Sequence, residues 1–206
     1  LIDAIHDGLK ESLALWPELV YMGQDIGPYG GVFKATEGLA DLFGSNRVRN
    51  TPLCESAIVG ASLGWSIAGG KAMMEMQFSD FVTTGFNQIV NNLAKLHWRW
   101  GQAVDVVVRM PTGAGVAAGP FHSQSTEAWF THVPGLKVVY PAFPGEAKGL
   151  LMASFNEPNP VLFFEHKAMY RTVREEVKEG PQFIELGKAD VVHSGTDLTV
   201  ITYGMG

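Results

Sequence analysis

The spacing of apolar and polar positions along the chain predicts alternating helices and strands. Apolar residues recur every three or four positions through Ile2–Leu15, Val32–Phe43 and Val82–Trp100. Further helices are expected at Pro144–Phe155 and Thr126–His132. Short apolar runs, typical of buried strands, occupy residues 19–22, 71–78, 104–108, 136–140 and 161–165. Strands that alternate with helices imply a doubly wound parallel α/β sheet with helices on both faces.

Towards the C-terminus the pattern changes. Residues 171–189 are polar and irregular, and this composition predicts a linker after a first domain of residues 1–170. The apolar run Leu198–Tyr203 predicts a strand that begins a second α/β domain in residues 190–206.

One apolar stretch organises the rest of the chain. Thr51 and Pro52 are a favourable helix start, and the helix they predict has few polar residues. Small residues recur along it at helical spacing, which predicts close packing on more than one side: Ala57, Gly60, Ala61, Gly64 and Ala68. Glu55 stands in its first turn. This carboxylate either complements the helix dipole or contacts a ligand in a dry site, because an unpaired buried carboxylate is costly.

Composition and charge narrow the function classes. The 206 residues are 46% hydrophobic and 17% charged, which is an ordinary composition for a globular protein. The 24 glycines are more than such a protein usually has. A net charge of −6 without a basic cluster argues against nucleic acid as the partner. The single cysteine, Cys54, excludes an internal disulfide and is expected to be a packing residue. We find neither a membrane-length apolar run nor a signal or transit peptide, so we expect a cytoplasmic protein.

Candidate chemistry lies in four connections. Ligands of parallel α/β sheets bind beyond the carboxyl ends of the strands. The predicted elements place Gly23–Gly31, the turn before Glu55, Gln77–Phe81 and Pro111–His122 at that edge. The glycine-rich sequence GAGVAAG departs from the dinucleotide and phosphate-loop motifs. His122, in FHSQS, is either structural or a proton donor, since histidines titrate near neutral pH. No pattern of His, Cys and acids has the spacing of a zinc site.

Four long blocks of the sequence resemble a known family. They are RVRNTPLCESAIVGASLGWSIAGG, MQFSDFVTTGFNQIVNNLAK, FHSQSTEAWFTHVPGLKVVYP and KGLLMASFNEPNPVLFFE. In this order they resemble the beta subunit of the thiamine diphosphate-dependent 2-oxo acid dehydrogenases, of the branched-chain or pyruvate type. The resemblance implies that residues 1–170 are a pyrimidine-binding domain and that residues 190–206 begin a transketolase-like C-terminal domain.

The resemblance also implies roles for particular residues. Glu55 matches the glutamate that hydrogen-bonds the pyrimidine N1′ of thiamine diphosphate, and it would need a dry site. Leu53, Gln77 and Phe81 match pyrimidine-contacting positions. His122 matches the histidine linked to acyl transfer onto a lipoyl group.

Partners and ions follow from the same resemblance. An alpha subunit, or an alpha domain of a fused chain, would hold Mg²⁺ and the diphosphate in an alpha2beta2 heterotetramer. A lipoyl-bearing acyltransferase and a 2-oxo acid, with 2-oxoisovalerate favoured over pyruvate, would be the other partners. Eukaryotic relatives of this kind work in the mitochondrial matrix. A K⁺ site would involve the following residues: Val104, Val106, Val107, Ser154, Glu157 and Asn159. Here Glu157 stands where the family has Asp, which puts that site in doubt.

Two other functions remain open. The chain could be a non-catalytic scaffold with the same fold, although Glu55 and His122 would then be unnecessary. It could also be a transketolase-like enzyme, but the HSQSTEAWFTHVPGLKVV block is typical of the dehydrogenases. Binding of thiamine diphosphate in the presence of an alpha partner distinguishes an enzyme from a scaffold.

Overall fold

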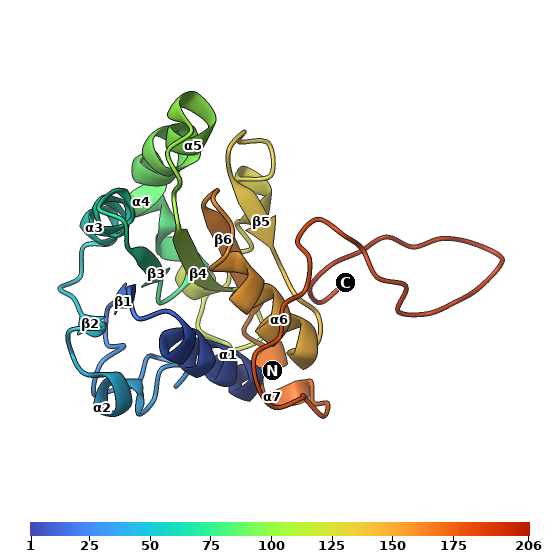
Figure 1. Ribbon diagram of the computed structural model, residues 1–206. Coiled ribbons are helices and arrows are strands. Elements are labelled where there is room, and N and C mark those ends of the chain that lie inside the picture. Colours follow the sequence, from blue (N-terminus) through green and yellow to red (C-terminus); the bar gives the residue numbers. More distant parts are fainter.

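Six parallel strands form a single sheet in the computed structural model, which describes residues 1–206 (Figure 1). The strands are β1 (Leu19–Gly23), β2 (Val48–Asn50), β3 (Lys71–Glu75), β4 (Val106–Thr112), β5 (Lys137–Val139) and β6 (Val161–His166). Their order is β2-β1-β3-β4-β6-β5, and every neighbouring pair is parallel. The winding direction changes between β1 and β3, which is where ligands bind in doubly wound sheets.

Helices cover both faces of this sheet, so the predicted doubly wound α/β fold is confirmed (Figure 1). One layer contains α1 (Ile2–Leu15), α2 (Leu39–Phe43), α6 (Pro144–Ser154) and α7 (Met169–Thr172). The other contains α3 (Glu55–Ile67), α4 (Val82–Asn87), a π-helical segment (Gln88–Leu93) and α5 (Ala94–Trp100). None of these helices combines the length and the apolar character needed to span a membrane.

The strands separate two hydrophobic cores. In β1, Leu19 and Tyr21 face the α1 layer, whereas Val20 and Met22 face the α3 layer. Successive side chains of a strand point to opposite faces, and here both faces are apolar because helices cover each of them. This explains why the strands appear in the sequence as continuous apolar runs.

A buried ion network joins the three central strands near their carboxyl ends. The Arg109 guanidinium donates to Glu165 from Nε (2.5 Å) and Nη2 (2.8 Å), and from Nη1 to Glu75. Tyr170 of α7 donates its hydroxyl to Glu165 at 2.6 Å. Burial raises the pKa of Glu75 although Arg109 opposes the shift. Burial alone would lower the pKa of Arg109, but the two carboxylates outweigh it and raise that pKa well above its ordinary value.

Two predicted helices differ in the structure, and one short strand was not predicted. The helix expected at Val32–Phe43 is reduced to α2, because Lys34 and Gly38 have φ of 66° and 74°, which a right-handed helix does not tolerate. Residues 126–132 contain only a three-residue 3₁₀ turn, Glu127–Trp129. Strand β2 was not predicted, since three residues leave almost no periodic signal.

The predicted strand at Leu198–Tyr203 is also absent. These residues are exposed and pair with no other strand, and Figure 1 shows the C-terminal segment looping out from the domain before its end returns close to α6. A β-strand needs a neighbour to satisfy its amides and carbonyls, so apolar character alone does not produce one. The second domain therefore stays a prediction.

Candidate functional site

Helix α3 begins later than its sequence suggests. Glu55 is its first residue, and the exposed, free thiol Cys54 is its N-cap rather than a buried packing residue. Thr51 does not cap the helix, because its amide donates to the Gly23 carbonyl at 2.9 Å and continues the pairing of β2 with β1. The turn between β2 and α3 thus brings Glu55 to the carboxyl edge of the sheet.

Glu55 is buried at this edge, with 6% of its surface exposed. The Thr84 hydroxyl of α4 lies 3.1 Å from Glu55 Oε2 and 2.8 Å from the backbone oxygen of Phe81, and its single proton serves these two acceptors. Thr84 therefore ties the carboxylate to the turn that carries Phe81. Glu55 Oε1 makes no hydrogen bond within the chain, so it is free to interact with a group outside the chain.

Aromatic rings bring His122 next to Phe81. The imidazole lies edge-on to Phe78 at 4.6 Å and to Phe81 at 5.5 Å between ring centroids. Phe78 and Phe81 lie 5.7 Å apart, and Phe33 contacts Phe78 at 5.5 Å. Loops after β1, β3 and β4 thus converge on one aromatic cluster, as expected for connections at the carboxyl edge.

Gln77 lies at the point where the winding of the sheet reverses. Its Nε2 donates to Asp25 Oδ2 at 2.8 Å, which joins the loop after β3 to the loop after β1. Leu53, in the turn before α3, is 78% exposed. The structure therefore brings Glu55, Phe81 and His122 into one region, with Gln77 beside it and Leu53 as an uncovered apolar side chain.

The outer face of α3 is not buried, contrary to the sequence-based expectation. Ala57, Ala61, Gly64 and Ala68 are exposed, and Gly60 is half-buried. Only the opposite face packs on the sheet and α4, through buried residues Ile58, Val59, Ser62, Leu63 and Ser66. The small residues that predicted close packing on two sides have a neighbour on one side only.

Three of the residues predicted to hold a monovalent cation, Ser154, Glu157 and Asn159, already have protein partners for their side chains. Glu157 accepts from Lys137 Nζ at 2.6 Å and from Asn159 Nδ2 at 2.8 Å. Asn159 Oδ1 lies 2.8 Å from His97 Nδ1, and Ser154 donates to a helix carbonyl. Burial would raise the pKa of Glu157, but these hydrogen bonds outweigh it and lower that pKa. The side chains therefore do not fit as ligands of a further cation.

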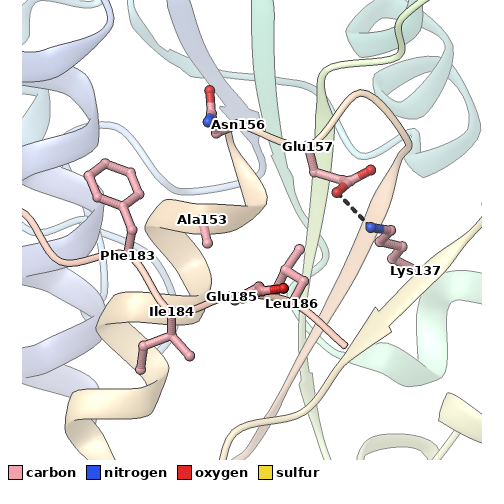
Figure 2. Close-up of a pocket in the computed structure, with 8 residues that line it drawn as sticks. All are labelled: Lys137, Ala153, Asn156, Glu157, Phe183, Ile184, Glu185 and Leu186. Atoms are coloured by element: carbon pink, nitrogen blue, oxygen red, sulfur yellow. Dashed lines mark hydrogen bonds and ion pairs between the residues drawn. The ribbon is translucent and has the colours of Figure 1, made fainter. Parts of the chain in front are cut away.

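The cation residues lie far from the candidate chemistry. A cavity of about 360 Å³ is lined by Lys137, Ala153, Asn156 and Glu157 together with the segment 183–186 (Figure 2). Lys137 begins β5 and Glu157 precedes β6, so the cavity is at the amino ends of the strands. Glu55 and His122 belong to the opposite edge. The structure contains no group of three or more His, Cys, Asp or Glu side chains able to hold a metal ion.

Sequence reasoning missed the residues that support the site. Thr84, Asp25 and Asp80 contact predicted site residues or their loop, but single threonines and aspartates carry no motif. Asp80 stands directly before Phe81, and its role depends on a contact with residues more than 40 positions away. Only the fold reveals such contacts.

Comparisons with known proteins agree with this architecture. Residues 1–173 match the family described as transketolase, pyrimidine binding domain. A solved structure described as a split gene transketolase, inactive beta4 tetramer, superposes with a TM-score of 0.77 over 98% of this chain and 62% of that chain. Because its sequence identity is 21%, this likeness concerns the fold alone.

Curated relatives are more similar in sequence. The chain is 47% identical to 2-oxoisovalerate dehydrogenase subunit beta of Bacillus subtilis, over 99% of this chain and 63% of that protein. It is 45% identical to the mitochondrial subunit beta 2 of Arabidopsis thaliana, over 99% of this chain and 58% of that protein. Identity to the Bacillus subtilis pyruvate dehydrogenase E1 component subunit beta is 43%, with coverages of 99% and 63%. The chain thus spans less than two thirds of these relatives, and the predicted resemblance to such beta subunits is confirmed.

Proposed function

The chain belongs to the family of transketolase pyrimidine-binding domains, and from this membership we propose that it is the pyrimidine-binding part of a 2-oxo acid dehydrogenase beta subunit. With an alpha partner it would decarboxylate a 2-oxo acid oxidatively and transfer the acyl group to a lipoyl group. The observation that carries the proposal is the buried Glu55 carboxylate, held by Thr84 beside Phe81 at the carboxyl edge of the sheet.

The residues at this edge fit an aminopyrimidine. A carboxylate with one free oxygen suits a ring nitrogen, and the Phe81 ring suits the flat face of an aromatic heterocycle. Glu55 would hold or share the proton at that nitrogen, with Gln77 and Leu53 as further contacts. Thiamine diphosphate, when bound, supplies an electron sink for decarboxylation. Magnesium and the diphosphate are assigned to the alpha partner, and potassium is left out because Lys137 already neutralises Glu157.

His122 would deliver a proton during acyl transfer. A lipoyl disulfide that accepts an acyl group leaves a thiolate, and a histidine is a suitable donor near neutral pH. The aromatic cluster sets the imidazole beside Phe81, so the donor is close to the ring proposed to cover the cofactor. The proposed division of labour gives proton sharing with the pyrimidine to Glu55 and protonation of the leaving thiolate to His122.

We favour a branched-chain substrate over pyruvate. Three 2-oxoisovalerate dehydrogenase beta subunits, including the two named above, are 45–47% identical to this chain, whereas three pyruvate dehydrogenase beta subunits are 41–43% identical. The difference is small but consistent. Activity of the assembled enzyme on 2-oxoisovalerate and on pyruvate, compared as kcat/KM, tests this preference.

The decisive experiment replaces Glu55 by Gln. Glu55→Gln keeps the shape but removes the carboxylate, so exchange of the C2 proton of bound thiamine diphosphate should slow by about 10²–10⁴-fold in the complex with the alpha partner. Glu176→Gln, an exposed glutamate in the polar segment, is the matched control and should match the wild type. Exchange in Glu55→Gln within a few-fold of wild type would contradict the assignment. A complex that forms but never binds thiamine diphosphate would instead indicate a scaffold.

A further inference from the structure

His122 depends on its loop for its position. The imidazole has aromatic contacts but no hydrogen bond within the chain. Its loop leaves β4 through Gly113, Gly115, Ala117 and Gly119, all with positive φ, and has no regular structure until the short turn at His122. Such a loop has many accessible conformations, so an external anchor is needed to hold the imidazole in one place.

Asp80 provides that anchor. It is 6% exposed, and its Oδ1 accepts hydrogen bonds from the backbone amides of Ser123 and Gln124, both at 3.1 Å. These are the two residues that follow His122. Charge-assisted hydrogen bonds from consecutive amides fix both the distance and the direction of the backbone. Thr112 adds a third tie, because its hydroxyl donates to the Gln124 carbonyl at 3.1 Å.

A buried lysine supplies the opposite charge. Lys167, directly after β6, is 3% exposed, and its ammonium has no hydrogen-bond partner in the chain. It lies 5.5 Å over the Phe78 ring, the same ring that contacts His122 at 4.6 Å. Burial lowers the pKa of Lys167 to about 8, while the charge of Asp80 acts in the opposite direction. The Phe78 ring thus contacts both the ammonium and the imidazole, and Asp80 hydrogen-bonds the loop and acts on Lys167 through its charge.

We propose that Asp80, supported by the charge of Lys167, is a positioning residue that fixes His122 for acyl transfer. The part of this inference that concerns acyl transfer rests on the proposed function. The anchoring of the loop by Asp80 does not rest on the proposed function, because it follows from contacts within this chain. Two measurements separate these parts.

The first measurement is amide hydrogen exchange in the full chain. Loss of hydrogen bonds to a charged acceptor should speed exchange at Ser123 and Gln124 by about 10- to 100-fold in Asp80→Ala, and by less in Asp80→Asn, which keeps one acceptor oxygen. Lys167→Met should give a smaller increase at the same amides. Asp105→Asn, at the opposite edge of the sheet, is the matched control and should leave both amides at the wild-type rate.

Amides of the central strands serve as the internal reference. Those of Met73 and Val107 lie in β3 and β4 and should stay protected in every variant. Exchange at Ser123 and Gln124 within twofold of wild type in Asp80→Ala would overturn the anchor. If Asp80→Ala and Asp80→Asn both lose protection in the central strands, Asp80 is needed for folding and the positioning role is also overturned.

The second measurement uses the complex with the alpha partner. The rate of lipoyl acylation is divided by the rate of decarboxylation read with an artificial electron acceptor. Asp80→Asn should lower this ratio as His122→Ala does, and the double variant should be no worse than His122→Ala alone. Faster amide exchange with an unchanged ratio would keep the anchor but refute acyl transfer by His122, so the two failures are distinguishable.

Discussion

The two helical layers that cover the sheet use apolar residues differently. In α1 the buried face, which includes Ile5, Leu9 and Leu13, packs on the sheet and on α6, and polar residues face outward. In α3 the buried face combines Ile58, Val59 and Leu63 with Ser62 and Ser66, and the outward face carries Ala57, Ala61 and other small residues. The α3 layer has a second apolar face that nothing in the chain covers.

The glycines of the two helices show the same difference in packing. A side chain added at Gly8 of α1 would meet Leu151 and Lys148 at 3.5 Å, so this glycine permits close packing of α1 on α6. At Gly60 and Gly64 of α3 it would meet nothing within 4 Å. A glycine inside a helix lowers helix stability, and close approach of a neighbour is the usual compensation. The neighbour of α3 is therefore to be sought outside this chain, which supports the proposed alpha partner.

The largest difference should appear when buried and exposed apolar residues of the two helices are truncated. Leu9→Ala in α1 should lower the free energy of unfolding by about 2–5 kcal/mol, because Leu9 is 0% exposed and its removal leaves a cavity. Ile67→Ala, on the outer face of α3 and 49% exposed, should change it by about 0.5 kcal/mol or less. Urea denaturation of the chain measures both. Similar losses of unfolding free energy in the two variants would mean that the outer face of α3 is packed as tightly as the buried face of α1.

The next effect concerns assembly rather than folding. Gly64→Leu should leave the chain as stable as wild type, since the space beside it is open, but should weaken binding of the alpha partner by about 10- to 100-fold through overpacking. The matched variant Gly8→Leu should leave the affinity for the partner unchanged and lower the free energy of unfolding by about 1–3 kcal/mol. Titration calorimetry with the partner and urea denaturation distinguish them. Unchanged partner affinity in Gly64→Leu would place the interface elsewhere.

The last comparison concerns pH dependence, and it sets one buried lysine on the α1 side against one at the carboxyl edge. Lys148 of α6 donates to Glu11 at 2.9 Å, whereas the ammonium of Lys167 has no partner. Burial lowers the pKa of Lys167 from 10.5 to about 8, against the effect of Asp80. Between these pH values the unfolded chain binds a proton that the folded chain does not, so the free energy of unfolding should rise with pH across this window.

Urea denaturation at several pH values between 7 and 10.5 tests this slope. Lys167→Met should abolish the rise that Lys167 contributes, and Lys148→Met, which alters a paired lysine, should retain it. An identical pH dependence in the wild type and in Lys167→Met would show that Lys167 keeps its proton throughout the window.

Periodicity predicted much of the fold. Helix α1 has the predicted bounds, and the helical pattern of Val82–Trp100 is an uninterrupted helix with a π-helical segment inside it. The misses follow from interactions that periodicity does not report. Positive φ at Lys34 and Gly38 shortened α2, and strand pairing of Thr51 delayed the start of α3. Local pattern thus predicts elements well where no tertiary contact competes.

The site was predicted only in part. The positions of Glu55 and His122 at the carboxyl edge follow from the order of elements and from the resemblance to a family. Thr84, Asp80 and Lys167 were missed, since their contacts join segments remote in sequence and residue type alone does not reveal them. In α3, by contrast, the sequence predicted a contact that the chain does not make. The small residues predicted burial on two sides of the helix, whereas the chain packs against only one side.

The buried network around Arg109 has a consequence for how the sheet assembles. Arg109 lies directly opposite Glu75 in the β3–β4 ladder, and Glu165 reaches it from β6. A slip of one residue between these strands would turn the guanidinium to the other face and leave buried charges without partners. The apolar residues of parallel strands discriminate poorly between registers, because both faces are buried. The three charges therefore favour the native register over its neighbours, because a misaligned pairing would bury charged groups that have lost their partners.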